Sequence, residues 1–136
     1  MAHSLGTIRE FNTEHFRVIV DAVEEHDLDL SWDERGTVAE DINDGHLVAF
    51  CARARVITHT GIELASDYLG NCVYSDISSF EDHRECAAYT REQQAKGSTA
   101  VCGSYFSDMV RSVCAEARRE YARIGAEITS VRLRAV

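Results

Sequence analysis

The chain has 136 residues, a formal net charge of −9 and 45% apolar residues. This length and composition are typical of one soluble globular domain, and they argue against intrinsic disorder. No apolar run approaches the ~20 residues that span a bilayer, and the start of the chain lacks the basic and apolar regions of a secretory signal, so we expect a cytoplasmic protein without a membrane partner.

The first predicted element is a half-buried strand from Phe16 to Trp32, because apolar residues recur at every second position in this segment. Glu24 interrupts the apolar face, so a bulge, a bend or a strand end is expected near this residue. The opposite, solvent-facing side of the strand would carry a row of acids whose neighbours lie at least ~6.6 Å apart. The members of this predicted row are Asp21, Glu25, Asp27, Asp29 and Asp33.

A short, mostly polar helix is predicted next, beginning at Asp33 or Thr37 and running to Asn43. Gly45 follows as its C-terminal stop, because glycine readily adopts the left-handed conformation that ends many helices. The polar composition places this helix on the surface.

A hairpin is predicted after the helix. The run HLVAFCARARVI, residues 46–57, alternates apolar and other side chains and therefore predicts a second strand. Gly61 supplies a turn, and the run IELASDYLGNCVY, residues 62–74, predicts the returning strand.

Two helices are predicted in the last third of the chain. Ser78 and Glu81 have the spacing of a capping box, which predicts a helix that starts here and ends before Gly97. The clearest helical pattern in the chain runs from Phe106 to Ile124, where apolar residues recur every three or four positions. The segment EITSVRLRAV, residues 127–136, alternates again and predicts a short strand at one edge of the sheet.

These elements predict an α+β fold in a single compact domain, residues 1–136. The expected architecture is a three- to four-stranded antiparallel sheet covered by two C-terminal helices, with a short surface helix between the first two strands.

The distribution of charge is the most informative feature of the sequence. Residues 1–50 carry twelve acids and three bases, a net charge of −9, whereas residues 51–136 carry eleven of each. Such asymmetry predicts an oppositely charged partner, here a basic protein surface in a nucleic-acid-handling complex. Direct binding of nucleic acid is not expected, because an acidic protein repels phosphates. The predicted partner-binding residues are Asp21, Glu25, Asp27, Asp29, Asp33, Glu34, Glu40, Asp41 and Asp44.

A calcium site is not predicted in the acidic segment. Asp27, Asp29, Ser31 and Asp33 match the odd ligand positions of a calcium loop, but Trp32 occupies the position that requires glycine. We therefore predict no metal site here and interpret the acids as a surface pattern.

The five cysteines form no C-x-x-C pair, and we interpret them as reduced thiols. Whether Cys72, His83, Cys86 or Cys102 form a site is left open by the sequence. We predict no catalytic residue and no cofactor. The alternative function is a small enzyme or cofactor-binding domain, with a site near Asp67, Tyr68, Cys72, His83 and Tyr105.

The stretches SDYLGNCVY and GSYFSDMVRSVCAEAR resemble small, uncharacterised proteins of bacteriophages and other mobile elements, a class that includes anti-CRISPR and anti-restriction proteins. What the resemblance implies is a non-enzymatic inhibitor that binds a host nucleic-acid-processing defence complex. A self-assembling accessory protein of a phage is the further alternative, since the sequence leaves the oligomeric state open.

Overall fold

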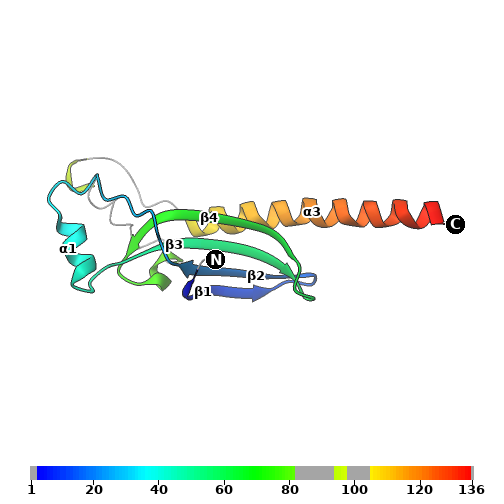
Figure 1. Cartoon of the computed structure of the whole chain (residues 1–136), viewed down its shortest axis with the longest axis horizontal. Coiled ribbons are helices and arrows are strands. Elements are labelled where there is room, and N and C mark those ends of the chain that lie inside the picture. Colours follow the sequence, from blue (N-terminus) through cyan, green and yellow to red (C-terminus); the bar gives the residue numbers. More distant parts are fainter. Residues whose placement is uncertain (1–2, 82–93, 98–104, 136) are drawn as a thin grey trace.

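The computed structural model describes residues 3–81, 94–97 and 105–135, with side chains described as far as Ser130. It contains an antiparallel sheet with one long helix lying along a face of it (Figure 1). The elements are β1 (Ser4–Asn12), β2 (Phe16–Val23), α1 (Thr37–Asn43), β3 (Val48–Thr58), β4 (Glu63–Tyr74), the 3-10 turn η1 (Ile77–Phe80) and α3 (Tyr105–Ala135).

The four strands form a meander in which each strand pairs with its neighbour in the sequence, in the order β1-β2-β3-β4. Tight turns join β1 to β2 and β3 to β4, and Gly61 in the second turn has a positive φ of 96°, which glycine adopts without strain. Residues 24–47 make the long connection between β2 and β3, and α1 lies within it. The predicted α+β fold with an antiparallel sheet is confirmed.

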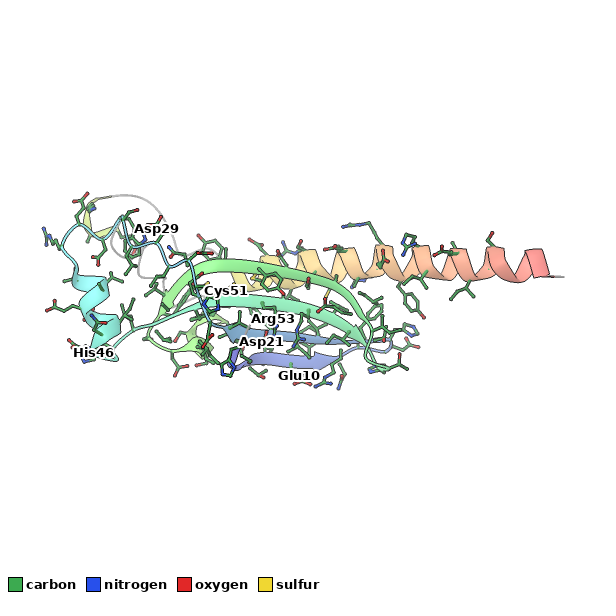
Figure 2. The ribbon with its side chains drawn as sticks, in the orientation of Figure 1. Glu10, Asp21, Asp29, His46, Cys51 and Arg53 are labelled. Atoms are coloured by element: carbon green, nitrogen blue, oxygen red, sulfur yellow. The ribbon has the colours of Figure 1, made fainter. Side chains whose placement is uncertain are left out.

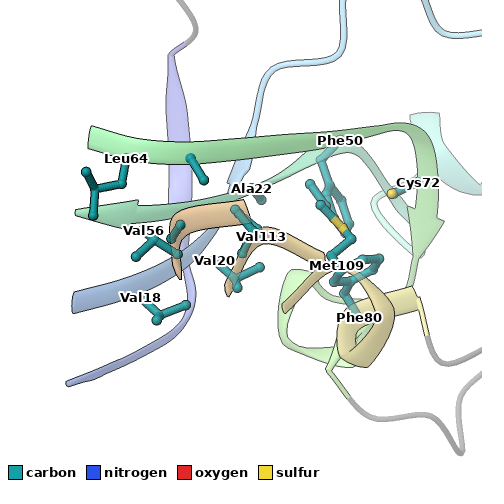
Figure 3. Packing of buried hydrophobic residues seen from close by; sticks show 14 of the residues in the cluster. Val18, Val20, Ala22, Phe50, Val56, Leu64, Cys72, Phe80, Met109 and Val113 are labelled. Carbon is teal, nitrogen blue, oxygen red and sulfur yellow. The ribbon is translucent and has the colours of Figure 1, made fainter. Parts of the chain in front are cut away.

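The main core lies between the sheet and α3. Met109, Val113 and Ala117 on the helix are buried against side chains that point from the strands toward it, such as Phe50 and Val20 (Figure 3). Consecutive members of this set are four residues apart, so all three share one face of the helix, as the sequence pattern predicted. The alternation of β3 is equally clear, because every even-numbered side chain from Phe50 to Val56 is buried.

A second apolar cluster lies on the opposite face of the sheet, at the end where β3 begins and β4 ends. Its buried members are Val38 of α1 and Val73 of β4. The partly buried side chains packed around them come mainly from the long connection, namely Leu28, Leu30, Trp32, Ile42, Leu47 and Ala49. This cluster fixes α1 and the loop before it to the sheet.

Three predicted elements differ from the structure. The strand that begins at Phe16 ends at Val23, so the prediction of a strand as far as Trp32 is wrong, although the expected strand end near residue 24 is present. The strand β1 was not predicted, because bulges near Gly6 and Thr7 break the alternation of apolar and polar residues along it. Residues 127–135 continue α3 and form no edge strand.

The helix predicted to begin at Ser78 falls largely outside the described residues. What is described there is η1, and its N-terminal cap is Asp76, whose carboxylate accepts a hydrogen bond from the backbone N–H of Ser78 at 2.9 Å. Gly97 has a positive φ of 89°, in keeping with its predicted role as a stop. In the part of the chain that the structure describes, no helix is both long and apolar enough to cross a membrane.

Candidate functional site

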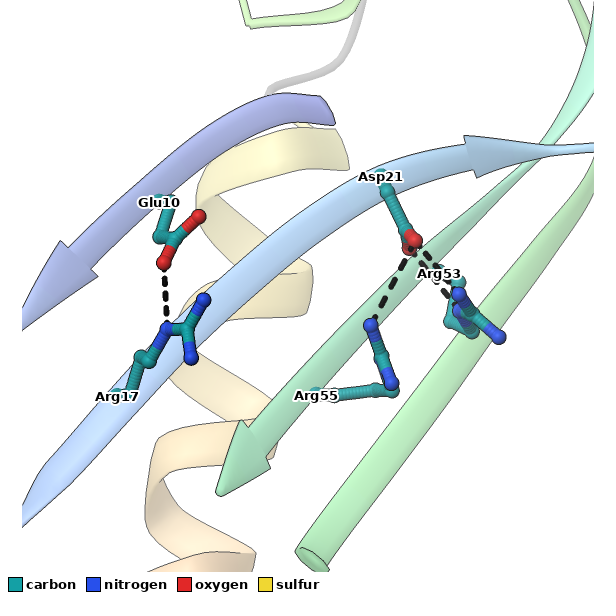
Figure 4. Close-up of polar contacts among 5 residues, drawn as sticks. All are labelled: Glu10, Arg17, Asp21, Arg53 and Arg55. Atoms are coloured by element: carbon teal, nitrogen blue, oxygen red, sulfur yellow. Dashed lines mark hydrogen bonds and ion pairs between the residues drawn. The ribbon is translucent and has the colours of Figure 1, made fainter. Parts of the chain in front are cut away.

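The predicted row of five acids on one strand face does not exist, because β2 ends before most of its members. Asp21 alone lies on the strand, and it is buried, with only 3% of its surface exposed. Arg53 donates from Nε and Nη2 to the two oxygens of the Asp21 carboxylate, at 3.0 and 2.6 Å (Figure 4). Nη2 of Arg55 lies 3.6 Å from the same carboxylate. Asp21 is therefore unavailable to a partner, contrary to the sequence prediction.

The strand register explains this ion pair. Asp21 of β2 is directly opposite Arg53 of β3, and cross-strand partners share one face of the sheet. The hydrogen bonds that Arg53 donates to Asp21 are the main cause that raises the pKa of the Arg53 guanidinium above its usual value. The sequence held a signal for the pair, since an acid in the apolar run VIVDAV faces a strand with two nearby arginines.

The other predicted acids lie together in a separate part of the molecule, which we call the acidic lobe and define as residues 24–47. It contains nine acids and a single base, Arg35, so its net charge is −8 and the remainder of the chain carries −1. Figure 2 shows Asp29 and His46 in this lobe, at one end of the molecule, apart from Asp21 and Arg53 in the sheet.

Glu25 anchors the lobe to β4. Its Oε1 accepts from the backbone N–H of Asp27 at 3.0 Å, and its Oε2 accepts from the backbone N–H of Asn71 at 2.5 Å. Asn71 adopts a positive φ of 59° at a bulge in β4. A Cβ at the adjacent Gly70 would lie 2.9 Å from Oε2 of Glu25, so a larger residue there would displace this carboxylate. Glu25 therefore has a structural role.

Asp29 and Asp33 also accept hydrogen bonds from backbone donors. Oδ1 of Asp29 accepts from the N–H of Ser31 at 2.9 Å, and this bond holds the pKa of the Asp29 carboxyl below its usual value. Oδ2 of Asp33 accepts from the N–H of Ala39 at 3.0 Å, in the first turn of α1. An aspartate in such a position satisfies a donor that the helix leaves without a partner.

The remaining acids of the lobe point to solvent or pair with basic side chains at the surface. Lys96 Nζ lies 3.5 Å from Glu34, and two histidine rings lie within 4 Å of carboxylates, His26 near Glu24 and His46 near Asp41. Asp41 is partly buried. The exposed acids without a structural hydrogen bond in the described part of the chain are Glu24, Asp27, Glu34, Glu40 and Asp44.

Two of the acids that matched a calcium loop, Asp29 and Asp33, accept local backbone hydrogen bonds. The backbone N–H of Ser31 occupies Oδ1 of Asp29, and Asp33 faces α1. Among the residues that the structure describes, no group of three or more His, Cys, Asp and Glu side chains is placed to hold a metal ion.

Of the residues named for the alternative enzyme or cofactor site, the structure describes Asp67, Tyr68, Cys72 and Tyr105. Asp67 is opposite Ala54, whose side chain faces α3, whereas Tyr68 is opposite Arg53 on the other face of the sheet. Cys72 is buried, and burial raises the pKa of its thiol to about 12, which keeps it protonated at neutral pH. His83, Cys86 and Cys102 lie outside the described residues.

Comparisons of the chain with protein-family models, with curated proteins and with solved structures found no match.

Proposed function

We propose that this protein works by binding, and that its acidic lobe docks on a basic surface of another protein. The observation that carries the proposal is the concentration of charge: a net −8 lies in 24 consecutive residues that the second apolar cluster holds against the sheet. A chain that needs acids only for solubility is served equally well by dispersed charge.

The structure separates the acids of the lobe into two groups. Glu25, Asp29 and Asp33 accept backbone hydrogen bonds, so the fold uses them. The exposed acids Asp27 and Glu40 make no such contact in the described chain, and like charges at this density repel one another. A partner with positive charge would relieve that repulsion.

Preorganisation of the lobe supports the same function. The backbone N–H of Asp29 donates to Oδ1 of Asn71 at 2.9 Å, and Trp32 Nε1 donates to the carbonyl oxygen of Asp29 at 2.9 Å. A loop held in this way loses little conformational freedom on binding, which favours affinity.

Clustered basic residues that could pair with such a lobe are typical of protein surfaces that bind nucleic acid. Our proposal is therefore a non-enzymatic inhibitor that occupies part of such a surface or docks beside it. The resemblance to small phage proteins narrows the proposed partner further, to a host defence complex of the kind that anti-CRISPR proteins block.

The proposal is tested by affinity capture from a bacterial lysate with two matched variants. The lobe variant is Asp27→Asn, Glu40→Gln and Asp44→Asn, and its control removes three exposed acids elsewhere. The control substitutions are Glu63→Gln, Asp108→Asn and Glu116→Gln. Both variants change the net charge from −9 to −6, because each removes three negative charges.

We expect the wild type and the control to retain a basic nucleic-acid-binding protein, which the lobe variant fails to retain. A partner that all three proteins retain equally contradicts the proposal. So does a captured partner without affinity for nucleic acid.

A further inference from the structure

A cleft of about 220 Å³ lies where α3 passes the turn between β1 and β2. The turn and the start of β2 line one side of it with Glu14 and Phe16, and α3 lines the other with Cys114 and Arg118. Figure 1 places this turn at the opposite end of the sheet from α1. The cleft is therefore separate from the acidic lobe, and a ligand bound in it would not occupy the surface of the proposed protein partner.

Contacts on both sides of the turn fix its shape. The backbone N–H of Phe16 donates to Oγ1 of Thr13 at 3.1 Å. Nε2 of His59, in the turn between β3 and β4, lies 3.2 Å from the carbonyl oxygens of Thr13 and Glu14. On the side of α3, the ring of Tyr121 packs edge-on against that of Phe16, with 5.4 Å between the centroids. The cleft thus exists before a ligand enters, which lowers the entropic cost of binding.

The inner surface of the cleft is apolar. Val18 on β2 is only 1% exposed, and Phe16 and Cys114 are partly buried. Burial raises the pKa of the Cys114 thiol, while the nearby charge of Arg118 acts in the opposite direction. A thiol of this kind is neutral at physiological pH, so the inner surface suits a small apolar group.

A carboxylate and a guanidinium line the same cleft. The Glu14 side chain is 88% exposed, and Nε2 of His15 lies 3.9 Å from its carboxylate. Arg111 and Arg123 of α3 pair with acids of their own helix, whereas Arg118 forms no ion pair with any residue that the structure describes. An anion and a cation are therefore both available to a molecule in this cleft.

These two charges restrict the class of ligand. A carboxylic acid without an amine would pair with Arg118 but would be repelled by Glu14, and an amine without a carboxylate would meet the reverse. A molecule that carries both charges close together satisfies both side chains through charge-assisted hydrogen bonds. The volume favours a small one, because an apolar cavity of about 150 Å³ accepts benzene, and about 220 Å³ has room for a short aliphatic side chain beside two charged groups.

We propose that this cleft binds a free α-amino acid with an aliphatic side chain, such as leucine. The α-carboxylate lies on the guanidinium of Arg118, and the α-ammonium lies on the carboxylate of Glu14. The aliphatic side chain packs against Val18, Phe16 and Cys114, which removes apolar surface from water. Because the cleft is partly open to solvent and smaller than a typical ligand pocket, the affinity is modest, with a dissociation constant on the order of 1 mM.

An NMR titration of the ¹⁵N-labelled full chain tests the site. L-leucine is added to about 20 mM, well above the expected dissociation constant, while the backbone amide signals of the cleft residues are followed. Each of two analogues lacks one charge. N-acetyl-leucine keeps the carboxylate, as a peptide C-terminus does, and leucine amide keeps the ammonium, as a peptide N-terminus does. These analogues distinguish a free amino acid from the end of a peptide.

Two pairs of variants test the two charges. Arg118→Gln is matched by Arg119→Gln. Glu14→Gln is matched by Glu116→Gln. All four side chains are exposed, and neither control residue lines the cleft. Both members of a pair remove the same charge, so an effect of net charge alone is equal within the pair, and the amide spectrum shows directly whether a variant is folded.

We expect leucine to shift the amide signals of the β1–β2 turn and of Cys114, and each analogue to bind at least about fivefold more weakly. Arg118→Gln and Glu14→Gln should weaken leucine binding to a similar extent, whereas their controls should change it by less than about twofold. Cleft signals that do not move at the highest leucine concentration overturn the proposal. So does equal binding of leucine and either analogue, or an equal effect of a variant and its control, because the paired charges would then have no role.

Discussion

Asp21 and the acids of the lobe are the same chemical group in opposite environments. The Asp21 carboxylate is buried and held by Arg53 and Arg55 of the neighbouring strand β3. The lobe carries nine acids with only Arg35 of its own, and several of them point to solvent. The Asp21 charge in the sheet is neutralised within the fold, whereas the lobe keeps a net charge of −8.

Under the proposed function, this difference separates acids that stabilise the fold from acids that bind a partner. A buried charge pair depends on both partners, because removal of one leaves the other without compensation in a medium of low polarity. Exposed carboxylates contribute little to folding. Replacement of Asp21 should consequently destabilise the fold, whereas replacement of the exposed lobe acids should leave its stability nearly unchanged.

The largest effect is expected at the buried pair. Asp21→Ala leaves Arg53 partly buried without its main partner, which should lower the free energy of unfolding by about 3–5 kcal/mol. Urea denaturation of this variant beside Asp27→Ala measures the contrast. A loss below about 1 kcal/mol would show that the Asp21 ion pair does not stabilise the sheet.

A smaller effect is expected where a lobe acid supports α1. Asp33→Ala removes the acceptor for the Ala39 N–H and should cost about 1 kcal/mol, whereas Asp33→Asn keeps an acceptor and should cost less. Thermal denaturation of the two variants and the wild type measures whether the alanine variant is the less stable of the two. Equal stability of the alanine variant and the wild type would mean that Asp33 is not a structural residue.

The fold was predictable where one face of an element is buried. The alternation of β3 and the three- and four-residue spacing of α3 both followed from burial on one side, as at Phe50 and Val113. The strand β1 was not predictable in this way, because its bulges shift Ile8 and Phe11 out of simple alternation. In the extension of α3, Ile128 is exposed. No buried face therefore imposes a helical spacing of apolar residues on this part of the sequence.

The candidate site was predictable in composition but not in geometry. A count of charged residues along the sequence identifies the acidic segment. The positions of its side chains in space depend on contacts with β4, which no local sequence pattern predicts. The hydrogen bond from Asn71 to Glu25 joins residues 46 apart in the sequence. The pairing of Asp21 with Arg53 required the register of two strands and was missed for the same reason.

A still smaller effect should appear only in acid. The backbone hydrogen bond from Ser31 lowers the pKa of Asp29 from its usual 3.8, so the charged form is favoured in the folded state. Its stabilising contribution is present above the unfolded pKa and is lost as the pH falls through the lower folded pKa.

Thermal midpoints of the wild type and Asp29→Ala, measured from about pH 6 down to about pH 2, test this dependence. The difference between the two proteins should be constant above the usual pKa and should shrink below it. A difference that stays the same throughout this range would exclude the Ser31 contact as its cause.

The smallest effect on stability is expected from the exposed acids. Asp27→Asn, Glu40→Gln and Asp44→Asn together should leave the free energy of unfolding within about 0.5 kcal/mol of the wild type, or raise it slightly as repulsion is relieved. Urea denaturation at low salt gives this value. A clear destabilisation would assign these carboxylates to the fold and weaken the functional interpretation.

The most direct test of the account is the affinity of the captured partner for these three-site variants at low and at physiological salt. The account predicts that the lobe variant binds at least about tenfold more weakly, a loss of ~1.4 kcal/mol, while the control with Glu63, Asp108 and Glu116 neutralised matches the wild type. The wild type should lose affinity as salt screens the charges, and the lobe variant should lose less. Equal affinity of the two variants would contradict the central claim, because the position of the charge would then have no role in binding.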